Sequence, residues 1–224
     1  MDEMSAFAGS GALRGSMGTA LREAGFQEEL FGEDAPPTAH YRLGDEDAGF
    51  YAEFLTPLRG AGLKRDGTPD ATVSKAGIKA QKLRYVDLLL VSPWSVRVGA
   101  SVGVPLAPDA SVRIPNPAAF IVQKLLIASE RRAQKRAQDI LYIHDTLELF
   151  GASLEELRRL WAEQVRPSMP AKTARRAVAT ATGAFEDVTD SIRDAARMPQ
   201  DRRLEPEHIR VACQYGLGEM LAPR

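Results

Sequence analysis

The pattern of apolar and polar positions divides the chain into two halves of different texture. From about residue 40 to residue 114, short β-type runs alternate with turn formers; the runs read HYRL, FYAEFLT, SVRVGASVGVPL and ASVRI. From Pro117 onward, apolar residues recur at helical spacing. Strands followed by helices favour an α+β fold with a mixed sheet and a helical C-terminal half. We expect an α/β core over residues 1–115 and a helical region over residues 116–224.

Capping residues indicate where the predicted helices begin and end. Asn116 is typical of an N-cap and Pro117 of a first helical position. Ser153 and Glu156 have the spacing of a capping box, and Gly151 is expected to end the helix before it. Further helices are expected at the following places: about residues 13–24, one within residues 171–198, and about residues 206–221.

The run FYAEFLTPLRG places one carboxylate, Glu53, among apolar residues. At the two-residue period of a strand, Phe50, Ala52 and Phe54 share one face, and Glu53 shares the other with Tyr51. Apolar residues on both faces predict a strand covered on both sides, where Glu53 needs a partner cation, a proton or a metal ion. The alternative is an edge strand on which Glu53 is open to water.

Composition constrains the function only weakly. The contents of 44% hydrophobic and 26% charged residues are typical of a soluble globular protein. With 29 basic and 30 acidic residues, net charge neither favours nor excludes a nucleic-acid partner. The single cysteine, Cys213, excludes an internal disulfide and is interpreted as a buried, unreactive thiol. Because we see neither a membrane-span-length apolar run nor a signal-peptide pattern, we expect a cytoplasmic protein without a membrane segment.

Two residues of opposite charge, Lys124 and Asp139, lie in the apolar helical segments that follow Pro117. Between them is a basic cluster: Arg131, Arg132, Lys135 and Arg136. In one interpretation the cluster is a solvated helix face, and Lys124 and Asp139 form a structural salt bridge. In the other, two helices meet at a phosphate-binding corner, where Asp139 orients a cation.

Other candidate motifs carry less information. A second basic run, SKAGIKAQKLRYVD, is interpreted as wet surface or as a groove for polyphosphate or nucleic acid; it contains Lys75, Lys79, Lys82 and Arg84. The three histidines, His40, His144 and His208, show no metal-ligand spacing along the chain. AGSGALRGS lacks the ending of a P-loop, and VGASVGVP is typical of a hairpin turn.

The order of these segments resembles bacterial nucleotidyltransferase-fold proteins of the polymerase-β-like superfamily, which are related to the nucleotidyltransferase toxins of abortive-infection systems. EFLTP is similar to a family phrase such as VDFLTP. IPNPAAFIVQKLLIASERRAQKRAQDI is similar to VPNPERFALHKLIV…R…KAxKDL. The resemblance covers most of residues 41–150, and it makes residues 1–115 a nucleotidyltransferase-like core.

The resemblance implies Mg²⁺-dependent transfer of a nucleoside monophosphate from an NTP to an acceptor hydroxyl. Glu53 stands where the family has its third carboxylate, and is therefore implied as a catalytic residue and metal ligand. Lys124 and Asp139 match a lysine and an aspartate of the toxin-like relatives, which implies phosphate binding by Lys124 and a catalytic role for Asp139. The nucleotide-binding set also takes in part of the basic cluster: Arg131, Arg132 and Lys135.

The same resemblance defines the partners only by class. It implies an NTP, an acceptor that is a tRNA, a protein or a small molecule, and a cognate antitoxin or another protein as a further partner. No membrane partner is expected.

One departure from the family pattern concerns the N-terminus. A glycine turn followed by Asp-x-Asp is expected upstream of the helix at residues 13–24, where Asp2 and Glu3 are the only acids. Either the chain begins too late or it is a degenerate member, since one carboxylate cannot assemble a two-metal site. We therefore expect a core that is incomplete at its N-terminus and a catalytically incomplete chain; whether it is an enzyme is left open. The alternative is a non-catalytic regulatory module that binds a nucleotide or a partner.

Overall fold

A computed structural model describes residues 16–32, 36–45, 49–103 and 110–223. The chain forms two compact units, Met1–Asp87 and Leu88–Arg224, and each is described by itself. The domain boundary expected between residues 115 and 116 stays a prediction. The glycine turn and Asp-x-Asp expected before residue 13, and the start of the helix expected there, lie outside the described residues.

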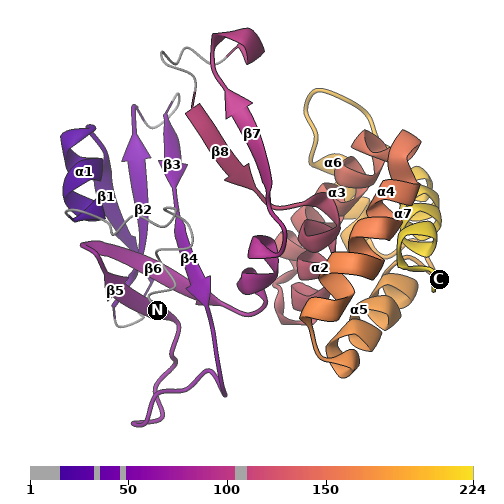
Figure 1. The fold of residues 1–224 in the computed structure, drawn as a ribbon, viewed down its shortest axis with the longest axis horizontal. Coiled ribbons are helices and arrows are strands. Elements are labelled where there is room, and N and C mark those ends of the chain that lie inside the picture. Colours follow the sequence, from indigo (N-terminus) through magenta and orange to yellow (C-terminus); the bar gives the residue numbers. More distant parts are fainter. Residues whose placement is uncertain (1–15, 33–35, 46–48, 104–109, 224) are drawn as a thin grey trace. The chain divides into compact units, whose positions relative to one another are not determined.

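The first unit contains two small sheets (Figure 1). The first sheet is antiparallel in the order β1-β2-β3; its strands are Gln27–Phe31, Thr38–Leu43 and Phe50–Ala52. The second has the order β4-β6-β5; its strands are Phe54–Pro57 (β4), Thr72–Lys75 (β5) and Ile78–Leu83 (β6). Since β6 pairs in parallel with β4 and antiparallel with β5, the second sheet is mixed, as predicted.

The start of helix α1 (Met17–Glu23) is hydrogen-bonded to the rest of this unit. The hydroxyl of Ser16 accepts a hydrogen bond from the Thr19 amide and donates one, 3.1 Å long, to the carbonyl of Ala76. A Cβ atom on Gly18 would lie 2.0 Å from the carbonyl oxygen of Gly77, so this close approach of two backbones requires glycine. Gly18 thus allows α1 to lie against the turn between β5 and β6.

Glu53 lies between β3 and β4 and belongs to neither strand. Its neighbours Ala52 and Phe54 pack against the buried core around Tyr41, whereas Tyr51 is 54% exposed. The predicted two-residue alternation is therefore correct from Tyr51 to Phe54. The predicted strand covered on both faces is wrong, because β3 ends the described sheet and the face carrying Tyr51 and Glu53 is open to water.

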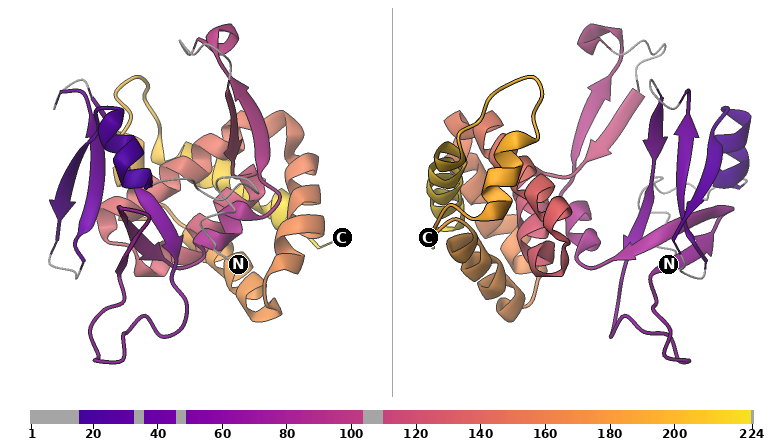
Figure 2. Two further views of the ribbon diagram at one scale, coloured as in Figure 1. Left: turned by 60° about the vertical axis from the view of Figure 1, so that its left-hand side comes forward. Right: turned by 180° about the vertical axis from the view of Figure 1, so that it is seen from behind.

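The second unit combines one β-hairpin with a bundle of helices (Figure 2). The hairpin pairs β7 (Trp94–Val98) with β8 (Ala110–Ile114) in antiparallel register, in agreement with the SVRV and ASVRI runs. Six helices follow: α2 (Pro117–Ile127), α3 (Ala133–Leu149), α4 (Leu154–Leu160), α5 (Ala171–Ala184), α6 (Asp190–Arg197) and α7 (Pro206–Leu221). The predicted α+β class with a helical C-terminal half is confirmed.

The helix α2 is the most enclosed element of the bundle. Nine of its eleven residues are buried, and it contacts α3, α4 and α5. Its predicted start is confirmed, since Asn116 Oδ1 accepts a hydrogen bond of 2.8 Å from the Ala119 amide and Pro117 occupies the first turn. Asn116 Nδ2 also donates to the carbonyl of Val91 at 2.6 Å, which ties the helix start to the chain before β7.

Two other predictions for the helices are wrong. Ser153 precedes α4 but makes no capping hydrogen bond with its side chain, and Glu156 instead pairs with Arg159 at 2.7 Å. Residues 171–198 form two helices where one was expected. The second of them, α6, has its own start signal, because the hydroxyl of Thr189 accepts a hydrogen bond from the Ile192 amide.

Candidate functional site

Two basic side chains of the second unit, Lys124 and Arg131, meet at one buried carboxylate, that of Asp139 on α3. Lys124 Nζ, from α2, lies 2.8 Å from Asp139 Oδ1, and Arg131 Nε lies 3.1 Å from Asp139 Oδ2. The side chain of Asp139 is 7% exposed, that of Lys124 13% and that of Arg131 25%. The sequence therefore identified a pair that the fold does bring together, across fifteen residues of chain.

Two aromatic rings complete the surroundings of the Lys124 ammonium. Its Nζ atom lies 5.3 Å from the ring centroid of Phe120 and 5.3 Å from that of Tyr142. A cation over an aromatic face is attracted by the ring quadrupole, more strongly when water is excluded. Lys124 does not snorkel away from the bundle; the rings and Asp139 hold its charge inside the corner between α2 and α3.

A cavity of about 190 Å³ opens beside this pair. Its polar lining consists of Lys124, Asp139, Arg136, Thr180, Thr189 and Ser191, and the rest is mainly apolar. Arg136, part of the basic cluster but not predicted as a site residue, donates to the carbonyl of Arg131 at 3.2 Å. Arg136 stands three residues before Asp139, on the same helix face, and this spacing is the signal that could have singled it out.

The charges at this corner sum to one positive charge, since Lys124 and Arg131 share the single carboxylate of Asp139. Arg136 adds a second positive charge at the cavity. A partly enclosed cationic cavity with hydroxyl groups is suited to an anion such as phosphate, because arginine offers forked donors and lysine a point charge.

The other two predicted nucleotide-binding residues lie further out. Arg132 and Lys135 are exposed near the start of α3, and Lys135 donates to Gln138 at 3.3 Å. Neither lines the cavity. They can add to the positive potential around it, whereas direct contact inside it is left to Lys124 and Arg136.

Glu53 is in the other unit and has a different kind of partner. Its Oε1 atom lies 2.5 Å from Nε2 of His40 on β2, and its side chain is 38% exposed. His40 is stacked against Tyr51 with ring centroids 4.6 Å apart. On the same face of the sheet, Glu29 holds Arg42 through two hydrogen bonds of 2.7 and 3.0 Å. Charges on this face are thus paired side by side on an open surface.

Two further carboxylates of the first unit, Glu28 and Asp70, pair with lysines. Lys79 Nζ lies 2.8 Å from Glu28, and the hydroxyl of Tyr41 donates to the same carboxylate. These hydrogen bonds, that of Lys79 foremost, lower the pKa of Glu28, while burial raises the pKa of Tyr41. Lys82 pairs with Asp70 at 2.7 Å. Lys79 and Lys82 of the second basic run are therefore engaged in ion pairs within their own unit.

The single cysteine of the chain lies in the second unit. Cys213 is fully buried on α7, as predicted, and burial together with nearby carboxylates raises the pKa of its thiol.

A larger, mostly apolar hollow of about 970 Å³ is lined by the helical turn that begins at Trp161, by α5 and by the end of α7. It contains none of the predicted site residues. Among the described helices, none is both long and apolar enough to cross a membrane.

The comparison with family models shows to which family the chain belongs. A nucleotidyltransferase family model matches residues 3–166, a range that includes Glu53, Lys124 and Asp139. Neither the comparison with curated proteins nor that with solved structures found a match. Because the match extends over well more than half of the sequence, this chain belongs to a nucleotidyltransferase family, whose general chemistry is transfer from an NTP.

Proposed function

We propose that this chain binds a nucleoside triphosphate at the corner between α2 and α3, with the phosphates against Lys124 and Arg136. The observation that carries the proposal is the shared carboxylate of Asp139, which leaves an excess of positive charge beside a 190 Å³ cavity. Membership of a nucleotidyltransferase family supports an NTP as the anion. The assignment of Glu53 and Asp139 as catalytic residues stays a prediction.

Each residue of the corner has a separate task in this proposal. Asp139 positions the ammonium group of Lys124 and the guanidinium of Arg131 before any ligand arrives. Arg131 donates through Nε to Asp139 and does not line the cavity, so it adds positive potential beside the cavity without touching the phosphates. Because these side chains are already positioned, less conformational entropy is lost when the ligand binds.

The family chemistry in full is Mg²⁺-dependent transfer of a nucleoside monophosphate to an acceptor hydroxyl, and we propose that this chain performs it weakly or not at all. The described residues around Glu53 do not fit a Mg²⁺ site. Mg²⁺ requires several oxygen ligands, whereas Glu53 faces His40 and the neighbouring Glu29 is engaged by Arg42.

The test is calorimetric titration of ATP, GTP, CTP and UTP into the purified chain, with and without Mg²⁺. We expect weak binding of at least one NTP, with Mg²⁺ changing the affinity only slightly. Lys124→Ala should weaken binding about tenfold or more, since one charge-assisted phosphate contact is lost. Lys172→Ala, at an exposed position on α5, is the matched control and should leave binding unchanged. Binding that Lys124→Ala does not alter would remove Lys124 from the site.

A second candidate function is a regulatory module that binds a nucleotide or a protein partner without catalysis. Basic side chains of the first unit pair with its carboxylates Glu28, Glu29, Glu53 and Asp70, which favours this candidate. Incubation with radiolabelled NTPs and pooled tRNA, protein or small-molecule acceptors separates the two candidates. Mg²⁺-dependent labelling that requires Glu53 would establish the enzyme; NTP binding without any labelling would favour the module.

A further inference from the structure

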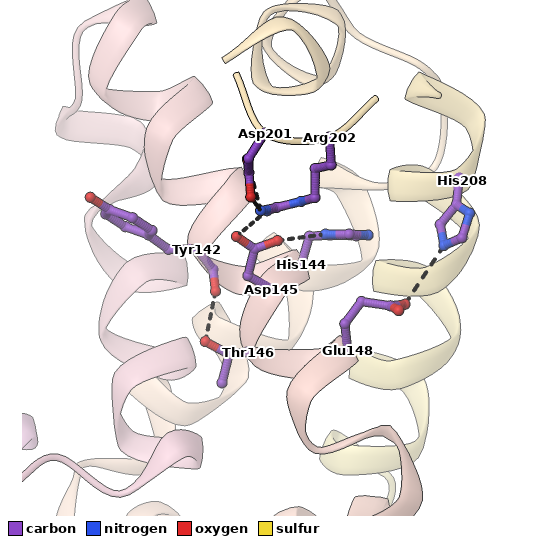
Figure 3. A network of polar contacts seen from close by, with 8 residues as sticks. All are labelled: Tyr142, His144, Asp145, Thr146, Glu148, Asp201, Arg202 and His208. Atoms are coloured by element: carbon purple, nitrogen blue, oxygen red, sulfur yellow. Dashed lines mark hydrogen bonds and ion pairs between the residues drawn. The ribbon is translucent and has the colours of Figure 1, made fainter. Parts of the chain in front are cut away.

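Three potential metal ligands meet where α3 and α7 are in contact. His144 and Glu148 are four residues apart on α3 and so lie on one face of the helix, and His208 comes from the first turn of α7. The nitrogen or oxygen atoms that these three residues offer lie within 4.8 Å of one another. Glu148 Oε1 and His208 Nε2 are 3.7 Å apart (Figure 3).

The ring of His144 provides independent evidence for a ligand at this cluster. Its side chain is 3% exposed, and its Nε2 atom is buried without a hydrogen-bond partner in the part of the chain that the structure describes. Its other nitrogen, Nδ1, lies 3.1 Å from Asp145 Oδ1. Figure 3 shows Nδ1 directed to Asp145 and Nε2 turned toward the side on which Glu148 and His208 stand. A buried nitrogen without a partner is costly, which favours a ligand for it.

The contact with Asp145 determines which nitrogen of His144 carries the proton. A carboxylate accepts the Nδ1 proton, so Nε2 retains the lone pair that a metal ion needs. Asp145 is itself held by Arg202, whose guanidinium lies 2.6 Å from Asp145 Oδ2. An imidazole oriented by a hydrogen-bonded carboxylate is the usual support of a metal-binding histidine.

We propose that His144, Glu148 and His208 form a binding site for a divalent transition-metal ion, with Zn²⁺ as the expected ion. Two imidazole nitrogens and one carboxylate are ligands that Zn²⁺ accepts, and a fourth position is left for water. Tetrahedral Zn²⁺ with ligands at about 2.0–2.1 Å separates them by roughly 3.3 Å. Glu148 and His208, 54% and 59% exposed, have the freedom to close this distance around the fixed His144 ring.

The site is independent of the proposed nucleotide site, since none of its ligands lines the cavity at Lys124. A bound ion would connect the first turn of α7 to α3, and through Asp145 and Arg202 it would also hold the segment that leads into α7. No local pattern indicates this site, because His208 lies far along the chain from the His144-x-x-x-Glu148 pair. The interpretation of the histidines as unrelated to metal is therefore revised for two of the three.

The test uses the full chain without an affinity tag, stripped of metal with a chelator that is then removed. Zn²⁺ is titrated by calorimetry, and Co²⁺ by its visible d–d absorption, which is intense only in tetrahedral coordination. We expect one ion per chain, with affinity reduced more than about tenfold by His208→Gln and by Glu148→Gln. Both replaced side chains are exposed, so folding should not be affected. His40→Gln, at the histidine of the other unit, is the control and should bind as the unaltered chain does.

Thermal unfolding gives a second readout. Zn²⁺ should raise the melting temperature of the unaltered chain and of His40→Gln, but not that of His208→Gln, because an ion bound to the native state stabilises it by mass action. Absence of Zn²⁺ and Co²⁺ binding, or equal binding by the unaltered chain and His208→Gln, would overturn the proposal.

Discussion

The two units place a carboxylate and its basic partner in opposite surroundings. In the first, Glu53 meets His40 on an open sheet face, where the two side chains are 38% and 24% exposed. In the second, Asp139 meets Lys124 and Arg131 inside a helical corner, and its side chain is 7% exposed. The chemical groups are comparable, but water screens the first pair and is largely excluded from the second.

This difference decides what each pair contributes. Exposed ion pairs contribute about 0–1 kcal/mol, because solvent competes for both charges. Buried pairs have high desolvation costs, so removing one partner leaves the other unpaired and costs about 3–5 kcal/mol. The lesson is that a carboxylate within an apolar run, such as Glu53, signals less than one whose charged partner comes from another buried helix, such as Asp139.

The largest expected effect comes from Asp139→Ala. It should lower the free energy of unfolding of the second unit by about 3–5 kcal/mol, since the Lys124 ammonium remains buried without its carboxylate. Urea unfolding followed by tryptophan fluorescence measures this directly, because both tryptophans of the chain, Trp94 and Trp161, lie in the second unit. Asp194→Ala, at an exposed position on α6, should change stability by less than about 0.5 kcal/mol. Similar losses in the two variants would abolish the contrast.

The next prediction compares the loss of stability from an apolar side chain with that from a charged one at the corner between α2 and α3. Leu125 is 2% exposed, and Leu125→Ala should cost about 2–5 kcal/mol through lost contacts and the cavity left behind. Arg131→Ala should cost less than about 1 kcal/mol, because Asp139 keeps Lys124 as a partner. The same fluorescence-detected urea unfolding applies. Equal losses would mean that the Arg131 contact is as important as the apolar face of α2.

In the first unit, Glu53→Gln should reduce stability by less than about 1 kcal/mol. The measurement is native-state hydrogen exchange of the amides in β2 and β3, combined with His40→Ala in a double-mutant cycle to isolate the pair. A coupling energy above about 2 kcal/mol would show that Glu53 is held as tightly as a buried carboxylate, and the contrast between the units would no longer stand.

The smallest effect concerns acid stability. Because Lys79 lowers the folded-state pKa of Glu28, this carboxylate contributes stability above the ordinary glutamate pKa, and the contribution is lost as pH falls through the lowered value. An NMR titration of the Glu28 side-chain carbon should give a pKa below that of an ordinary glutamate. In Lys79→Gln the pKa should move back up. An unchanged midpoint would assign the shift to something other than the Lys79 contact.

Local signals in the sequence account for much of the fold. Asn116 and Pro117 begin α2, the run ASVRI coincides with β8, and α7 occupies the range predicted for it. Two-residue alternation also assigned Ala52 and Tyr51 to opposite faces correctly. These features are readable because capping, backbone sterics and side-chain periodicity act over a few neighbouring residues. Ser153 is the exception: its spacing to Glu156 fits a capping box, but Glu156 binds Arg159 instead.

What surrounds a side chain was decided by the tertiary structure. The sequence alone established an apolar α2 with a lysine in it and a basic segment before Asp139, and it indicated the family. It could not determine that Glu53 faces water, since this depends on β3 being an edge strand. Nor could it bring His208 to His144, because their meeting depends on how α7 packs on α3. Contacts between distant segments are set by how whole faces bury together, and one chain's local pattern does not specify which faces meet.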